Sequence, residues 1–204
     1  MNEGTLLKVM QKRQVPELGP STPQRGNRFS SAVSRGAIRL FGWRFEGAIP
    51  DVRKAVLIIA PHTSNWDFPL GVAAMFALGL QAVFLGKHTL FGRTLGPMMR
   101  WLGGVPVDRG AASGVVGETV RLFSSREQMI LVLSPEGTRS TVERWKTGFY
   151  HIAVRAEVPI VPVAFDYGTR RISIGDCFVP TGEMVSDLRI LENFFSGVEG
   201  RCGH

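Results

Sequence analysis

The sequence predicts a single α/β domain with a largely parallel central sheet flanked by helices. From residue 54 onward, short apolar runs of strand length alternate with longer segments of helical periodicity. This is the pattern of parallel strands joined by helices. A chain of 204 residues is long enough for one domain with its own core. Its 44% hydrophobic and 20% charged residues are ordinary for a globular protein.

The predicted strands are short apolar runs rich in β-branched residues. They cover residues 55–60, 82–85, 105–107, 129–133, 160–165 and 171–174. The predicted helices have apolar residues at helical spacing and cover residues 68–80, 90–102, 115–123, 148–156 and 184–195. Pro97 predicts a kink in the second of these helices, and Gly103 predicts its end. The apolar run over residues 68–80 is shorter than the about 20 residues of a transmembrane helix, which favours a buried helix.

The N-terminal part of the chain differs in composition from the rest. Residues 1–28 are polar, contain three prolines and show no periodicity, which predicts a mobile tail. Residues 29–45 form a basic amphipathic segment, with Val33, Ala37 and Leu40 at helical spacing among several arginines. Such a segment is compatible with two structures, a helix in a membrane interface and a helix packed on the domain. The main domain is predicted to cover residues 46–204.

The charge balance limits the classes of partner. The chain carries 24 basic and 17 acidic residues, a net charge of +7, which favours anionic partners such as phosphorylated molecules or acidic lipid surfaces. Nucleic acid is disfavoured because the basic residues are scattered and no recognition motif occurs. Two cysteines without metal spacing indicate a reduced, cytosolic protein, and the histidines and carboxylates predict no metal site. The first residues lack the apolar stretch of a secretory signal.

One stretch combines a strand end with candidate catalytic residues. Residues 55–69 read AVLIIAPHTSNWDFP, so His62 follows a predicted buried strand and Asp67 begins a predicted helix. Open α/β sheets bind ligands at such strand ends. A tight turn, closed by Ser64 or Asn65 as a helix cap, would place the imidazole against the carboxylate. That pair would make a general base with its orienting group. By itself, the spacing is more typical of a capped turn with an incidental histidine.

Three further segments place polar residues at the ends of predicted elements. They are residues 103–109 (GGVPVDR), 134–140 (SPEGTRS) and 158–163 (VPIVPV). Singly, they are compatible with a surface ion pair, a turn and a buried strand. In this order after His62 and Asp67, however, they resemble the four sequence blocks of the phospholipid/glycerol acyltransferase family. That family contains the bacterial lysophosphatidic acid acyltransferases, and the resemblance covers roughly residues 54–167.

The resemblance implies an acyltransferase domain in residues 46–204 and a reaction. A hydroxyl group of a lipid acceptor would attack the thioester of an acyl donor, with His62 as the base and Asp67 as its orienting partner. The implied donor is acyl-CoA or acyl-carrier protein, both of them substrates, and no cofactor is implied. The leading acceptor is a lysophospholipid, 1-acyl-glycerol-3-phosphate, in phospholipid biosynthesis. The absence of a Gly-x-Ser-x-Gly elbow agrees with direct attack by the acceptor.

The residues that the resemblance assigns to substrate binding are Arg109, Glu136, Gly137, Thr138 and Arg139. Arg139 offers a fork of donors that matches phosphate oxygens, and Arg109 is a second candidate cation. Gly137 allows close approach of the backbone, and Thr138 adds a hydroxyl group. A carboxylate would repel phosphate, so Glu136 is assigned to positioning, in which it would hold an arginine or a hydroxyl group of the acceptor.

Other functions remain open from the sequence. The acceptor could be another lyso-lipid such as a lyso-aminolipid, or His62 could activate water in a thioester hydrolase. A lipid-binding module without catalysis is a third alternative. Because a lipid acceptor lies in a bilayer, we expect peripheral binding to the cytoplasmic face of a membrane. The sequence does not predict an oligomeric state.

Overall fold

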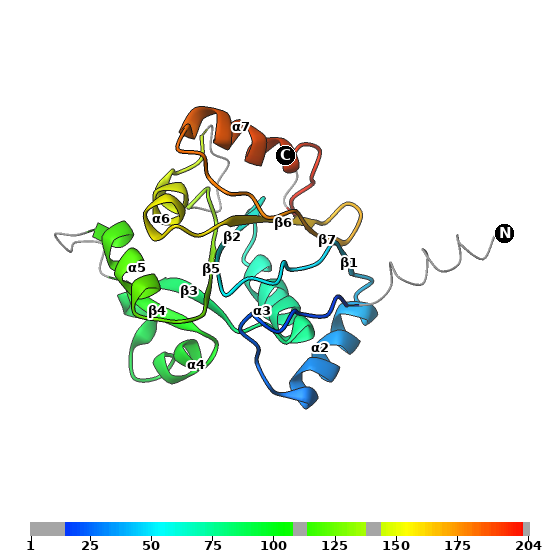
Figure 1. Cartoon of the computed structure of the whole chain (residues 1–204). Coiled ribbons are helices and arrows are strands. Elements are labelled where there is room, and N and C mark those ends of the chain that lie inside the picture. Colours follow the sequence, from blue (N-terminus) through cyan, green and yellow to red (C-terminus); the bar gives the residue numbers. More distant parts are fainter. Residues whose placement is uncertain (1–14, 108–113, 138–143, 202–204) are drawn as a thin grey trace.

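Seven strands form one sheet in the order β1-β7-β6-β2-β5-β3-β4, with helices on both faces (Figure 1). The computed structural model describes residues 15–107, 114–137 and 144–201. The strands are β1 (Arg44–Glu46), β2 (Lys54–Ala60), β3 (Ala82–Lys87), β4 (Gly104–Val107), β5 (Met129–Leu133), β6 (Ile160–Asp166) and β7 (Arg171–Ile174). All neighbouring strands pair in parallel except β6 and β7. The predicted α/β fold with a largely parallel sheet is therefore confirmed.

The helices follow most of the predicted segments. They are α2 (Arg28–Leu40), α3 (Asp67–Leu78), α4 (Gly96–Trp101), α5 (Gly114–Ser124), α6 (Gly148–Ala156) and α7 (Met184–Phe194), with a short 3-10 helix η1 (His88–Phe91). The helix predicted over residues 90–102 is wrong in its first half. Gly92 is extended at the end of η1, and α4 begins only at Gly96, where Pro97 occupies the first turn instead of kinking a longer helix. None of the described helices has the length and apolarity needed to span a membrane.

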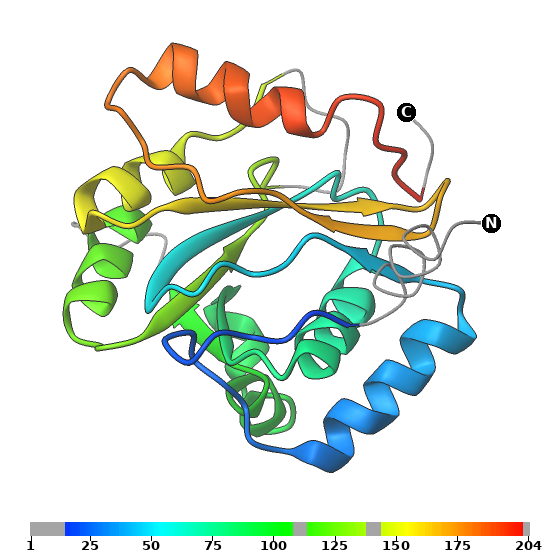
Figure 2. The ribbon, with the colours of Figure 1, turned by 45° about the vertical axis from the view of Figure 1, so that its right-hand side comes forward.

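The central strands are buried on both sides because helices cover both faces of the sheet. Helices α2, α3 and α4 cover one face, with Ile38, Phe76 and Leu102 in its core. Helices α5, α6 and α7 cover the opposite face, with Phe123, Ile152 and Leu191 in a second core. The two views agree on this arrangement, since α7 lies on one side of the sheet and α2 and α4 lie on the other (Figures 1 and 2).

Residues 15–27 lie against the domain, although the sequence predicts a mobile tail up to residue 28. The Asp51 carboxylate accepts hydrogen bonds from the backbone N–H groups of Ser21 and Thr22, and Thr22 is buried. The Arg25 guanidinium lies over the rings of Phe76 and Trp101, 4.6 and 4.7 Å from their centroids. These contacts are long-range and use polar residues, so the composition of the segment does not reveal them. The part of the predicted tail before residue 15 lies outside the described residues.

The parallel strands bring several loops to one edge of the sheet, which we call the carboxyl edge. Strands β2, β5 and β6 lie side by side and end at Ala60, Leu133 and Asp166. The loop after β2 contains His62, and the loop after β5 contains Glu136. Because parallel strands end at the same side, segments far apart in the sequence meet here.

Candidate active site

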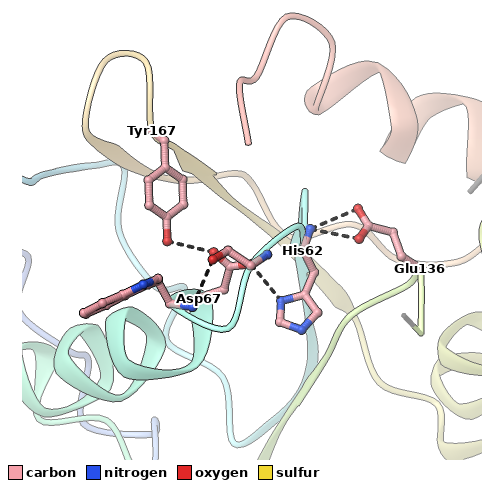
Figure 3. A network of polar contacts seen from close by, with 6 residues as sticks. His62, Asp67, Glu136 and Tyr167 are labelled. Carbon is pink, nitrogen blue, oxygen red and sulfur yellow. Dashed lines mark hydrogen bonds and ion pairs between the residues drawn. The ribbon is translucent and has the colours of Figure 1, made fainter. Parts of the chain in front are cut away.

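The turn between β2 and α3 holds the His62 imidazole against the Asp67 carboxylate. Atom Nδ1 of His62 lies 3.0 Å from Oδ2 of Asp67, and the two side chains are 23% and 2% exposed (Figure 3). Helix α3 begins at Asp67, one residue before the predicted helix over residues 68–80. The N-cap residue is Trp66, whose side chain makes no capping bond, so the predicted cap by Ser64 or Asn65 is wrong in detail. Ser64 still closes the turn, because its N–H donates to Oδ2 of Asp67 at 2.9 Å and its hydroxyl accepts from Trp66 N–H.

Asp67 is held by three donors that keep it ionised. Its Oδ1 accepts a hydrogen bond from the Tyr167 hydroxyl at 2.7 Å, while Oδ2 faces His62 and the Ser64 N–H (Figure 3). Burial alone raises the pKa of Asp67. The hydrogen bonds from His62, Tyr167 and Ser64, together with the charge of His62, outweigh burial and lower that pKa below its ordinary value. The carboxylate therefore fixes the proton of His62 on Nδ1 and leaves Nε2, on the other side of the ring, to accept a proton.

Tyr167 is a site residue that the sequence interpretation missed. It lies directly after β6, so the rule that strand ends meet at the carboxyl edge could have identified it. The edge of the Trp43 ring packs against the Tyr167 ring, with centroids 4.9 Å apart at 90°. The Tyr167 N–H also donates to the Glu199 carbonyl, which joins the C-terminal segment to the site.

Glu136 supports the turn that carries the base. Both of its carboxylate oxygens accept from the backbone N–H of His62, at 3.1 and 2.9 Å, and the residue is nearly buried (Figure 3). The peptide bond before Pro61, the neighbour of His62, is cis. Glu136 thus positions the backbone of the His62 turn, whereas the sequence interpretation gives it the task of holding an arginine or a hydroxyl group of the acceptor. Its contact with substrate stays a prediction.

Gly137 occupies a position that only glycine fills without strain. Its φ is +64°, in the left-handed region, and an added Cβ would lie 2.8 Å from Cδ and 3.0 Å from Nζ of Lys146. The Lys146 N–H donates to the Pro135 carbonyl at 2.8 Å. The ammonium group of Lys146 thus lies beside the loop predicted to bind phosphate. Arg109, Thr138 and Arg139, the other predicted binding residues, lie outside the described residues.

The part of the chain that the structure describes contains no group of three or more histidine, cysteine, aspartate or glutamate side chains arranged to hold a metal ion. The side chains that the described part of the site brings together are those of His62, Asp67 and Tyr167, beside the loop that carries Glu136. The arrangement can remove a proton from a bound hydroxyl group or water and hold the resulting imidazolium.

Comparisons with known proteins agree with this geometry. A family model described as Acyltransferase matches residues 43–166. The 1-acyl-sn-glycerol-3-phosphate acyltransferase of Escherichia coli is 31% identical over 165 residues, covering 76% of this chain and 65% of that protein. The human 1-acyl-sn-glycerol-3-phosphate acyltransferase alpha is 31% identical over 137 residues, covering 60% of this chain and 47% of that protein. The chain therefore spans less than two thirds of the length of these relatives.

A solved structure has the same fold. The crystal structure of the 1-acyl-sn-glycerophosphate (LPA) acyltransferase PlsC from Thermotoga maritima superposes with a TM-score of 0.61 at 24% identity. The superposition covers 84% of this chain and 77% of that one. The family model covers more than half of the 204 residues, including the His62 turn, the Glu136 loop and β6. The protein belongs to the acyltransferase family.

Proposed function

We propose that the protein transfers a fatty acyl group from a thioester donor to the free hydroxyl group of 1-acyl-glycerol-3-phosphate. The observation that carries this proposal is the His62–Asp67 pair, 3.0 Å apart at the carboxyl edge, with Nε2 of the imidazole on the side away from Asp67. General-base help of this kind contributes about 10²–10⁴ in rate. The relatives from E. coli and human, both 1-acyl-sn-glycerol-3-phosphate acyltransferases, support this acceptor.

The proton transfer of the reaction is assigned to this pair. The acceptor oxygen attacks the thioester carbonyl carbon while Nε2 of His62 takes the hydroxyl proton, and Asp67 stabilises the imidazolium. The tetrahedral intermediate collapses by breaking its carbon–sulfur bond. His62 returns the proton to the departing thiolate, so an ester and a free thiol leave the site.

The phosphate group of the acceptor requires cations near this pair. Lys146 beside Gly137 supplies one in the described part of the chain. We assign the same task to Arg139, with Arg109 as a second cation, from the family resemblance. We expect Arg139→Ala to raise the KM of the phosphate-bearing acceptor more than that of the donor. Lysine at that position restores only part of the loss, because it lacks the bidentate geometry of arginine.

The experiment that tests the reaction follows thiol release and lipid products together. Purified protein is given acyl-CoA or acyl-carrier protein with lysophosphatidic acid, with a lyso-aminolipid, or with no acceptor. We expect thiol release to depend on lysophosphatidic acid and to match diacyl product one to one in mass spectrometry. Thiol release that ignores the acceptor would indicate a hydrolase, and product from the lyso-aminolipid alone would replace the proposed acceptor.

We also propose that the protein acts as a peripheral protein on the cytoplasmic face of a membrane, with α2 in the interface. Helix α2 packs on α3 through Ile38 and through a hydrogen bond from Arg35 to the Ala77 carbonyl, so the helix is anchored to the domain. Its Leu40 and the adjacent Phe41 point outward, 83% and 66% exposed. From the sequence, residues 29–45 are expected either to lie in a membrane interface or to pack on the domain. A helix that is packed on one side and exposed on the other is compatible with both.

A double variant tests the role of α2. Leu40→Ser with Phe41→Ser is expected to weaken binding to anionic vesicles without lowering the melting temperature, because both side chains are exposed. Trp43 is unsuitable for this test because its ring packs on Tyr167 at the active site. Unchanged binding of the double variant would exclude α2 as a membrane contact.

A further inference from the structure

Helices α2 and α4, and α3 after its first residue Asp67, lie in two sequence stretches without acidic residues. Residues 18–45 and 68–107 contain no aspartate or glutamate. They do contain basic residues, namely Arg25, Arg28, Arg35, Arg39, Arg44, Lys87, Arg93 and Arg100. All of these except Arg25 are exposed. Apart from Asp67 in the catalytic turn, this layer of helices therefore carries positive charge only.

Most of the exposed large apolar side chains lie on the same layer or at its carboxyl edge. On α2 and just after it they are Phe29, Val33, Leu40 and Phe41, and at the start of α3 they are Trp66 and Phe68. On η1 and α4 and between them they are Leu90, Leu95, Met98 and Trp101. The rest of the described surface has only Val154, Val179, Val185 and Ile190 as exposed large apolar residues. All exposed phenylalanine and tryptophan side chains of the described residues thus lie on this side.

The exposed apolar residues of α2 and those of η1 and α4 are held together by packing. Helices α2 and α4 lie on the same side of the sheet in both views (Figures 1 and 2). The rings of Phe76 of α3 and Trp101 of α4 pack against each other, and the Arg25 side chain, just before α2, lies over both rings and donates to the Trp101 carbonyl. Because of this link, the segment leading into α2 and the end of α4 form one structure instead of two independent flaps.

The layer also borders the active site. Asp67 is the first residue of α3, and Trp43, three residues after the end of α2, packs on the Tyr167 ring that contacts Asp67. Helix η1 follows the carboxyl end of β3, and an added Cβ on Gly86 of that strand would lie 2.7 Å from the Phe91 ring. A flat surface that contacts this layer would therefore lie next to the carboxyl edge, where His62 is.

We propose that η1 and α4 form a second membrane contact beside α2, and that the whole layer docks on an anionic phospholipid bilayer. Segments that lie in the bilayer interface are typically composed of exposed Trp, Phe and Leu residues among arginines. Each basic residue near an anionic surface adds about 1 kcal/mol of attraction. Cations without carboxylates match lipid headgroups, which supply the negative charge. The inference rests on the proposed function, because it brings the site to the membrane that contains a lipid acceptor.

The test compares equal changes on the two faces. Leu95→Ser with Met98→Ser, called the α4 variant, removes one exposed side chain at the N-cap of α4 and one on the helix, and Val185→Ser with Ile190→Ser is the matched control on α7. Flotation with vesicles of phosphatidylcholine and phosphatidylglycerol measures binding, and a melting curve confirms the fold. We expect the α4 variant to bind at least about 10-fold more weakly, and the control to change less than about twofold.

A charge pair gives a second, independent readout. Arg93→Glu on the proposed surface is expected to weaken binding to the same vesicles by about 10-fold. Arg155→Glu, an exposed arginine of α6, is expected to have little effect. Binding of the wild-type protein should fall with added salt and with vesicles of phosphatidylcholine alone. An α4 variant that binds like wild type, or a control pair that is equally damaging, would overturn the proposal.

The design separates this inference from the proposed reaction. With a short-chain, water-soluble lysophosphatidic acid as acceptor, the α4 variant is expected to have the turnover of wild type, because neither substituted residue belongs to the active site. If wild-type protein transfers no acyl group to any acceptor yet shows the expected loss of vesicle binding in the α4 variant, the reaction is wrong and the surface stands. If the variant instead abolishes self-association in the absence of lipid, seen by sedimentation velocity, the surface binds a second copy and the membrane assignment is wrong.

Discussion

Two buried aspartates, each bonded to a tyrosine hydroxyl, have different roles in this protein. Tyr167 donates to Asp67 at the carboxyl edge, and Tyr150 of α6 donates to Asp187 in the first turn of α7, both at 2.7 Å. Asp187 also accepts from the N–H and hydroxyl of Thr181, at 2.8 Å each. The hydrogen-bond donors to Asp187 are neutral groups that hold no exchangeable charge near neutral pH. The network therefore has a structural role and joins α7 to α6. Asp67 has a histidine as its additional partner, and this histidine is the group to which we assign proton transfer.

The comparison shows that a buried, ionised carboxylate is not by itself a sign of catalysis. For both aspartates, burial alone raises the pKa, and hydrogen bonds reverse that effect and lower it. Burial also raises the pKa of Tyr150, and its bond to Asp187 adds to this shift, so the tyrosine stays protonated. Chemistry requires a partially exposed base as well, and only the Asp67 network contains one, the 23% exposed His62.

The largest expected difference is between the two asparagine variants. Asp67→Asn removes the charge that fixes the tautomer of His62, so kcat per folded molecule should fall by about 10²–10⁴. Its amide would also face the Tyr167 and Ser64 donors, so some stability should be lost as well. Asp187→Asn leaves a buried donor facing the Tyr150 and Thr181 donors and should cost about 2–3 kcal/mol of unfolding free energy. Its turnover per folded molecule should be unchanged. Acyl-transfer kinetics and urea titrations of both variants measure this, and equal effects on kcat would remove the distinction.

A smaller effect is expected for the tyrosines. Tyr167→Phe deletes one bond to a charged carboxylate, worth about 1.5–3 kcal/mol, and we expect kcat to fall roughly 10-fold with an unchanged acceptor KM. The acid limb of its pH–rate profile should also shift, because Tyr167 acts through Asp67 and His62. Tyr150→Phe should lower the melting temperature and leave both kinetic constants unchanged. A Tyr167→Phe protein that is less stable but has wild-type kcat and pH profile would reduce Tyr167 to a structural role.

The smallest expected effect concerns stability in acid. An unfolded aspartate has a pKa of about 3.9, and both native pKa values lie below their ordinary range. The unfolded state therefore binds more protons, and each aspartate contributes stability that is complete above that pH and is lost as the pH falls through the native pKa. Urea midpoints measured from pH 5 downward should fall less steeply for either asparagine variant than for wild type. Parallel curves would show that these carboxylates do not have lowered pKa values.

The sequence predicts elements well where local pattern decides and poorly where distant contacts decide. Strand β5 and helix α6 have the predicted bounds, because each is a complete apolar run or stripe bounded by turn residues. Strand β1 is an edge strand of three residues without an apolar run, and the pattern does not reveal it. Amphipathicity predicts α2, yet it does not tell which side faces the protein. Ile38 is buried there, whereas the equally apolar Phe29 and Leu40 face outward.

The candidate site divides in the same way. His62 and Asp67 are five positions apart and belong to one turn, so sequence blocks are enough to find them. The bond from Tyr167 to Asp67 joins residues 100 positions apart and depends on β6 lying beside β2. The contact of Glu136 with the His62 N–H likewise requires the pairing of β2 and β5. Only the sheet order reveals such contacts.

The most direct measurement is the turnover of His62→Ala with lysophosphatidic acid and an acyl thioester. The side chain is partly exposed in a polar turn, so the variant should fold, which circular dichroism and a melting curve check. Product is quantified by mass spectrometry together with free thiol. If His62 is the base that activates the acceptor, product formation falls by about 10²–10⁴ and thiol release falls with it. Wild-type product formation by a folded His62→Ala protein would contradict that role.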